Sequence, residues 1–165
     1  MTHVTPSTTT EPQKPQSTEG ELNAARHARK VERISDFLRR RQSTAPLSRQ
    51  KRVVSHQVPK VNDKKHSDEK IDLTDLDEVI EIDVERRICI AEPGIPFCEL
   101  VDKTLPYGLV PIVVPELKTI TIGGAVAGCS IESMSYMYGG FHDTCLEYEI
   151  ITAEGDVLYC TPENE

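Results

Sequence analysis

The residues with the clearest chemical potential lie between Thr119 and Gly140, which read TITIGGAVAGCSIESMSYMYGG. A glycine pair, Gly123 and Gly124, is followed by small residues as far as Gly128. Without a Cβ the backbone can approach a ligand closely, and successive N–H groups can form a concave set of donors for phosphate oxygens. A helical turn near Ala125 would add its N-terminal dipole. The pattern predicts a phosphate site or, as is common for glycine pairs before helices, tight packing of the backbone.

Charge restricts how such a phosphate could be held. Residues 1–70 hold 15 of the 19 Lys and Arg residues but only 8 of the 27 Asp and Glu residues, so residues 71–165 are strongly acidic. A pyrophosphate there would depend on amides and hydroxyls rather than on lysines. The candidate hydroxyls are Thr119, Thr121, Ser130, Ser133 and Ser135. Because neither GxGxxG nor a Gly-Lys-Ser/Thr triplet is present, neither a Rossmann nucleotide site nor a P-loop is predicted.

The elements before this segment begin with a long helix. Residues 2–20 contain almost no large apolar side chain, so residues 1–20 are predicted to form a disordered tail. Apolar residues then recur at steps of three and four, which predicts an amphipathic helix over residues 21–42. Arg39 to Arg41 close it, either as a solvated helix end or as a contact with anionic lipid. Nucleic acid is excluded as a partner because no aromatic residue is interleaved and the rest of the sequence is acidic.

Residues 43–165 alternate between strand and helix patterns. After a loop with one short strand candidate, Arg52 to Val58, the segments 79–84 and 88–90 predict a hairpin, and residues 97–105 predict a short helix. The apolar run from Leu109 to Val114 predicts a strand buried on both faces. Residues 147–152 and 157–160 predict a second hairpin. This order predicts a mixed α+β fold.

Cellular location and cysteine use give further expectations. The sequence has no apolar run long enough to span a bilayer and no apolar secretory signal, which predicts a cytoplasmic protein or one peripheral to the endoplasmic reticulum membrane. The cysteines are odd in number and widely spaced without a CxxC pair, so we predict reduced thiols that pack as small buried hydrophobes. A redox pair or a metal site is the alternative. They are Cys89, Cys98, Cys129, Cys145 and Cys160.

An ordered series of short motifs resembles the delta(24)-sterol reductase (diminuto-like) family and, more broadly, flavoproteins of the vanillyl-alcohol-oxidase type. The motifs occupy residues 105–111, 114–117, 121–124, 128, 131–133, 138–139 and 147–155. The resemblance implies that residues 43–165 form an incomplete PCMH-type FAD-binding domain of two α+β subdomains, ending before the domain is finished. It also implies that FAD, chiefly its diphosphate, contacts one continuous segment. That segment comprises Thr121, Ile122, Gly123, Gly124, Ala125, Val126, Ala127, Gly128, Cys129, Ser130, Ile131, Glu132 and Ser133.

The activity that the resemblance implies is reduction of a carbon–carbon double bond in the side chain of a sterol, with NADPH reducing the flavin and the flavin passing hydride to the substrate. An FAD-dependent oxidase of a sugar or hydroxy acid is an alternative. A second alternative is that the chain is a truncated fragment without catalysis, which acts through its basic helix. The sequence therefore leaves open whether the protein is an enzyme. It also departs from many relatives because residues 51–56 replace a glycine-rich phosphate loop.

No catalytic residue and no metal ligand are assigned. His142 lies beside Asp143, and such a pair could relay protons or tune a flavin, although an ordinary loop histidine is the simpler interpretation. Glu132 could contact a cofactor hydroxyl or be a carboxylate at a helix end. Tyr136 and Tyr138 are expected to be half-buried packing residues.

Overall fold

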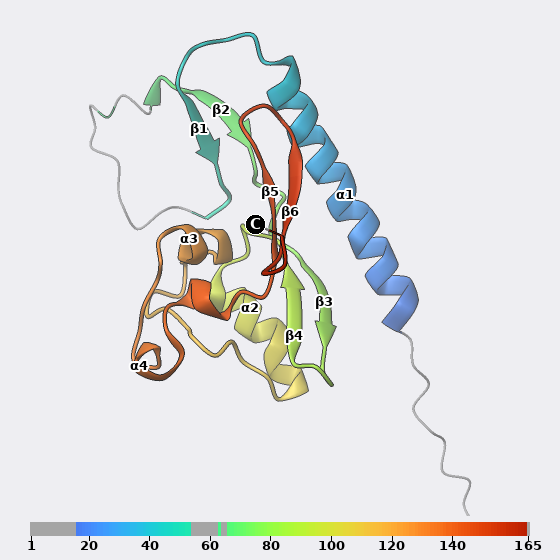
Figure 1. Ribbon diagram of the computed structural model, residues 1–165, viewed down its shortest axis with the longest axis vertical. Helices are drawn as coiled ribbons and strands as arrows, with labels where there is room; N and C mark the ends of the chain where they lie inside the picture. The colour runs from blue at the N-terminus through green and yellow to red at the C-terminus, as the bar shows by residue number, and fades with distance from the viewer. Residues whose placement is uncertain (1–15, 54–62, 64–65, 165) are drawn as a thin grey trace, which may run out of the picture.

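The computed structural model describes residues 16–53, 63 and 66–164 of the chain, and its elements form a mixed α+β arrangement (Figure 1). The sheets are small: β1 pairs with β2 in parallel, while β3–β4 and β5–β6 are antiparallel hairpins. The predicted fold class and both predicted hairpins are thereby confirmed. The elements in sequence order are α1 (Gln16–Arg40), β1 (Leu47–Gln50), β2 (Glu69–Asp72), β3 (Val79–Asp83), β4 (Ile88–Ala91), α2 (Phe97–Thr104), the 3-10 turn η2 (Leu105–Tyr107), α3 (Ile122–Ala127), α4 (Ser135–Tyr138), the 3-10 turn η3 (Phe141–Thr144), β5 (Tyr148–Ile151) and β6 (Val157–Cys160).

Helix α1 lies along one side of the molecule with β5 and β6 beside it, whereas α3 and α4 lie on the side away from it (Figure 1). Ile34 on α1 packs with Ile71 and Leu76 in a small buried cluster. The helix starts at Gln16, earlier than its apolar periodicity predicts, so the segment expected to be disordered overlaps its first turns. The polar N-terminal turns carry no apolar stripe, and for that reason periodicity did not detect them.

The basic and acidic parts of the sequence contact each other through ion pairs along helix α1. Basic side chains of α1 face carboxylates of the acidic part of the sequence, in the pairs Arg26–Glu78, Lys30–Glu92, Arg33–Asp75 and Arg39–Asp156. Arg41, just after the helix, pairs with Glu69 of β2. The exposed pairs of Arg26, Arg33 and Arg39 each contribute about 0–1 kcal/mol, whereas Glu92 in the pair with Lys30 is buried. The helix is therefore held by charge complementarity as well as by its apolar stripe, and these cations already have partners within the protein.

A second core cluster supports the segment of chemical interest. Phe97 of α2 and Phe141 of η3 stack edge to face, with ring centroids 4.9 Å apart, and Ala125 of α3 is fully buried beside them. Aromatic pairs in this geometry favour a fixed orientation beyond the area that they bury. The cluster also contains Ile95, Leu100 and Val113. It fixes α3 relative to α2 and to the turn that precedes β5.

The strand predicted over residues 109–114 does not form. Residues 109–114 form an irregular loop in which Val113 is buried but Val110 and Ile112 are more than half exposed. Pro111 interrupts this run and Pro115 directly follows it, and neither has the N–H group that a central strand needs. The candidate from Arg52 to Val58 lies largely outside the described residues, and Arg52 and Val53 are not in a strand. Strand β1 instead occupies residues predicted to be loop, where its hydrogen-bonding partner β2 is distant in sequence.

All five cysteines are free thiols, as expected, but the prediction that they are buried is wrong for Cys89 and Cys129, which are exposed. The other three are partly buried. Cys89 lies on β4 of the hairpin β3–β4, and Cys129 has a positive φ of 48° just after α3. Within the described residues no group of side chains is suited to hold a metal ion. None of the described helices is long and apolar enough to cross a membrane.

Candidate functional site

The predicted cofactor segment is anchored to the turn before α2. The N–H of Phe97 donates to the carbonyl of Ile120, and the N–H of Ile122 donates to the carbonyl of Ile95, at 2.9 and 3.0 Å. Thr121 is buried and caps α3, because its hydroxyl accepts the N–H of Gly124 at 3.3 Å. Threonine is among the preferred N-cap residues, which explains why the helix starts here. The start of the segment is therefore structural.

The glycine pair has a packing role at its first position. The N–H of Gly123 donates to the carbonyl of Pro93 at 2.8 Å, and a Cβ on Gly123 would lie 2.7 Å from the Cβ of Pro93. The N–H groups of Ile122, Gly124 and Ala125 also have acceptors within the protein. The concave set of amide donors that the sequence suggested at this bend is thus already used. Of the two interpretations, tight packing accounts for Gly123.

The outer surface of α3 is poor in side chains. Gly124, Ala127, Gly128 and Cys129 are all exposed, whereas Ala125 faces the core. A Cβ on Gly124 would meet only the hydroxyl of Thr121, at 3.1 Å. A ligand can therefore approach the backbone of this turn from outside, which is the property that the small residues were expected to provide.

A carboxylate orders the turn that follows. Glu132 accepts hydrogen bonds from the hydroxyl of Ser133 at 2.6 Å and from the N–H of Met134 at 2.7 Å. Its own N–H donates to the hydroxyl of Ser135 at 3.0 Å. These bonds, the one from Ser133 foremost, lower the pKa of Glu132. Glu132 therefore acts as a local carboxylate cap, and its contact with a cofactor hydroxyl stays a prediction.

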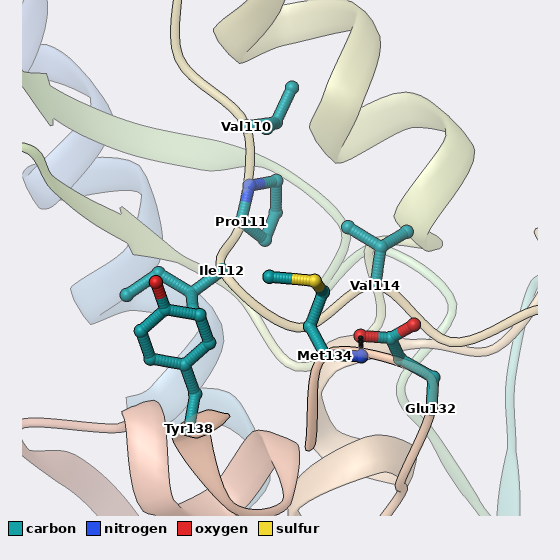
Figure 2. A pocket seen from close by; sticks show the side chains of 7 residues that line it. All are labelled: Val110, Pro111, Ile112, Val114, Glu132, Met134 and Tyr138. Carbon is teal, nitrogen blue, oxygen red and sulfur yellow. Dashed lines mark hydrogen bonds between the residues drawn. The ribbon is translucent and has the colours of Figure 1, made fainter. Parts of the chain in front are cut away.

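Beside this turn lies an open apolar groove with a volume of about 400 Å³ (Figure 2). Figure 2 shows Met134 and Tyr138 extending from one side toward Pro111 and Ile112 on the other. The carboxylate of Glu132 and the hydroxyl of Tyr138 are its polar side-chain groups. Small-molecule sites span roughly 300–1,000 Å³ and are mostly apolar with few polar groups. The lining residues are Val110, Pro111, Ile112, Val114, Glu132, Met134 and Tyr138.

Sequence reasoning missed most of this groove. The loop residues 110–114 were assigned to a buried strand, and Met134 was not considered. The prolines that flank exposed apolar residues in this loop are the signal that could have shown it. Tyr136, expected to be half-buried, is 82% exposed, and Tyr138 is 43% exposed and lines the groove.

The pair of His142 and Asp143 is not arranged as a proton relay. The Nε2 atom of His142 lies 3.5 Å from the carboxylate of Asp143, and that carboxylate accepts the N–H of Gly140 at 2.7 Å. The Nδ1 atom of His142 is buried without a hydrogen-bond partner among the described residues. Asp143 thus caps η3, in agreement with the interpretation of His142 as a loop histidine.

Arg52 belongs to residues 51–56, the stretch where the resemblance stated above would place a glycine-rich phosphate loop. Its guanidinium contacts Asp77 and also Glu99, the latter at 2.7 Å. Both carboxylates belong to the acidic part of the sequence. The cation is therefore already neutralised on this surface.

Comparison with known proteins gives a consistent result. The model of a family described as "FAD binding domain" matches residues 24–161. Delta(24)-sterol reductases of Pisum sativum and Homo sapiens are 38% and 34% identical over 95 and 90 residues, which are 58% and 54% of this chain. Decaprenylphosphoryl-beta-D-ribose oxidase of Mycolicibacterium smegmatis is 32% identical over 93 residues, or 56% of this chain. These stretches cover 17%, 17% and 20% of the respective relatives, so the chain spans a fifth or less of their length.

The fold also resembles that of a solved oxidase. The crystal structure of 6-hydroxy-D-nicotine oxidase from Arthrobacter nicotinovorans superposes with a TM-score of 0.60. The superposition covers 83% of this chain and 28% of the oxidase, at 20% sequence identity. At that identity the likeness concerns the fold alone.

Proposed function

The chain belongs to the FAD binding domain family, and from this membership we propose that it forms the FAD-holding part of an oxidoreductase that reduces a carbon–carbon double bond in the side chain of a sterol. The protein is an FAD-binding domain of a flavoprotein oxidoreductase and resembles delta(24)-sterol reductase. The relatives of that name, from a plant and from an animal, support the finer assignment. When bound, FAD supplies hydride transfer, with NADPH as the proposed reductant.

The observation that carries the proposal is that the predicted cofactor segment and the apolar groove adjoin each other. Residues 121–133 begin at the buried Thr121, pass through the exposed, side-chain-poor residues of α3 and end at Glu132 and Ser133, beside the apolar groove. We propose that the diphosphate lies over Gly124, Ala127 and Gly128, where no large side chain obstructs it. The flavin ring is proposed to lie along the groove, whose lining is mostly apolar. The amide of Gly123 is not part of this surface, since it is bonded to Pro93.

A second candidate function is oxidation of a sugar, with oxygen as the electron acceptor. It is supported by the 32% identity to decaprenylphosphoryl-beta-D-ribose oxidase. The third hypothesis, a fragment without catalysis that acts through its basic helix, receives less support. Three arginines of α1, Arg26, Arg33 and Arg39, are in ion pairs with Glu78, Asp75 and Asp156.

A chimaera tests whether this protein holds FAD. The matching 95-residue stretch of the Pisum sativum sterol reductase would be replaced by that of the present sequence. We expect the chimaera to purify with bound flavin and to reduce the sterol double bond with NADPH. A chimaera that folds but purifies without flavin would overturn the proposal. Flavin binding with loss of sterol reduction would preserve the FAD assignment and remove the sterol assignment.

Within that chimaera, Ala127→Glu is expected to weaken FAD binding by about 10- to 100-fold, since a carboxylate placed against a diphosphate costs on the order of 1–3 kcal/mol at a partly solvated site. Ala127 is exposed, so the substitution does not disturb the core. Affinity would be measured by quenching of flavin fluorescence. Ala153→Glu introduces the same charge at the exposed turn between β5 and β6 and should leave the affinity unchanged. Equal losses of FAD affinity in Ala127→Glu and Ala153→Glu would count against the proposed site.

A further inference from the structure

His27 of α1 is placed between two carboxylates that come from different parts of the sequence. Its Nδ1 atom lies 2.9 Å from Oε1 of Glu92, just after β4, and its Nε2 atom lies 3.4 Å from Oε1 of Glu149 on β5. A neutral imidazole has only one N–H, so its other ring nitrogen presents a lone pair. Favourable contact with both carboxylates therefore requires the doubly protonated, cationic ring.

Glu92 and Glu149 differ in their other cationic neighbours. Glu92 is fully buried and also accepts hydrogen bonds from Lys30 at 2.9 Å and from the N–H of Glu78 at 2.8 Å. Lys30 in turn contacts Glu78 at 3.1 Å, which Arg26 approaches at 3.6 Å. Glu149 is 35% exposed, and His27 is its only cationic neighbour within ion-pair distance in the described part of the protein.

We propose that His27 is a pH-dependent link that fastens the β5–β6 hairpin to helix α1. On deprotonation, the remaining proton stays on Nδ1, because the buried carboxylate of Glu92 would otherwise lose a hydrogen bond where water cannot replace it. Nε2 then presents its lone pair to Glu149, and the attraction becomes a repulsion. The contact to β5 is lost while α1 stays attached to the β3–β4 side through Lys30 and Glu92.

The expected loosening is local because other contacts hold the turn of the hairpin. The hydroxyl of Ser35 donates to the carbonyl of Gly155 at 2.5 Å, and Arg39 approaches Asp156 at 3.7 Å. Gly155 lies directly against α1, where an added Cβ would be 2.6 Å from the carbonyl oxygen of Ser35. The turn end therefore remains docked. The open end, near Tyr148 and Cys160, should loosen.

The direction of the pH effect follows from the same geometry. The hydrogen bond to Glu92, with the charges of Glu92 and Glu149, outweighs burial and raises the pKa of His27 above its ordinary 6.5. A group whose pKa is raised by folding stabilises the fold fully below the unfolded value and loses that contribution as pH rises through the folded value. The hairpin should therefore be tightest on the acid side of neutrality.

Hydrogen exchange of the full-length protein tests the link, with rates corrected for the intrinsic effect of pH. Between about pH 6 and about pH 9 we expect protection of β5 and β6 to fall by roughly two- to fivefold, as suits the loss of one partly exposed ion pair. Protection of β3 and β4 should not change. In Glu149→Gln the response should disappear, since an amide can donate to the neutral ring or accept from the charged one. An NMR titration of His27 in this variant should give a lower pKa than in the wild type.

Glu154→Gln is the matched control. It removes one negative charge from the exposed turn of the same hairpin and should keep the wild-type response. Three results would overturn the proposal: hairpin protection independent of pH in the wild type, an equal loss in β3–β4 and β5–β6, or a wild-type response in Glu149→Gln. The proposal concerns α1 and the hairpin and does not depend on which cofactor is bound.

Discussion

Replacing Glu92 by alanine is expected to lower the free energy of unfolding by about 3–5 kcal/mol, the usual cost of removing one partner from a buried ionic cluster. The Glu92 side chain is completely buried and bridges His27 and Lys30 of α1 to the N–H of Glu78. Without it, both cations lose their buried counter-charge and the amide loses its acceptor. Helix α1 should detach in part, because Glu92 lies just after β4 and is held by two side chains of α1.

Urea unfolding followed by circular dichroism measures this effect. Glu81→Ala is the matched control, because Glu81 is exposed on β3 and should cost less than about 0.5 kcal/mol. Burial raises the pKa of Glu92, but the hydrogen bonds from His27 and Lys30 outweigh it and lower the pKa below its ordinary value. The wild type should therefore lose this contribution as pH falls through the lowered value, and Glu92→Ala should lose less over that range. If Glu92→Ala and Glu81→Ala lowered the free energy of unfolding by similar amounts, the role assigned to Glu92 would be wrong.

Gly123→Val is expected to destabilise the protein by about 3 kcal/mol or more, the upper range for overpacking against a rigid neighbour. A Cβ at this position would lie 2.7 Å from the Cβ of Pro93 and 3.1 Å from its carbonyl oxygen, and the proline ring cannot rotate away. The hydrogen bond from Gly123 to Pro93 would also be lengthened.

Gly124→Ala provides the comparison for Gly123→Val. Its Cβ would meet only the Thr121 hydroxyl, and alanine is favoured over glycine in a helix by about 1 kcal/mol, so its net effect should be within about 1 kcal/mol. Thermal and urea unfolding of both variants would show the difference. If Gly123→Val folds as stably as Gly124→Ala, the packing role assigned to Gly123 is wrong.

Local patterns allowed the hairpins and the amphipathic helix to be predicted from the sequence. Alternating apolar residues and intervening turns are short-range signals, and both hairpins form where they predict. The pair β1–β2 could not be found in this way, because its hydrogen bonds join residues such as Leu47 and Glu69 across a long intervening segment. Residues 109–114 show the opposite error, in which apolar composition outweighed the two prolines.

The sequence predicts a candidate cofactor segment, but it does not show which groups of that segment face outward. The spacing of small residues directed attention to Thr121 through Ser133, and the family match includes that stretch. The amide of Gly123 is not free because it is bonded to Pro93, which is distant in the sequence. No local pattern encodes a tertiary contact of this kind. The role of Glu92 was likewise invisible, since only burial distinguishes it from the other acidic residues of the sequence.

Addition of FAD to the isotopically labelled protein, followed by amide NMR shifts, tests the central claim most directly. The account predicts that shifts concentrate at the exposed residues from Gly124 to Ser133 and along the groove at residues 110–114, Met134 and Tyr138. Gly123 should respond weakly because its amide remains bonded to Pro93. Shifts confined to α1 and Arg52, or no shifts at saturating FAD, would contradict the assignment of this surface to the flavin nucleotide.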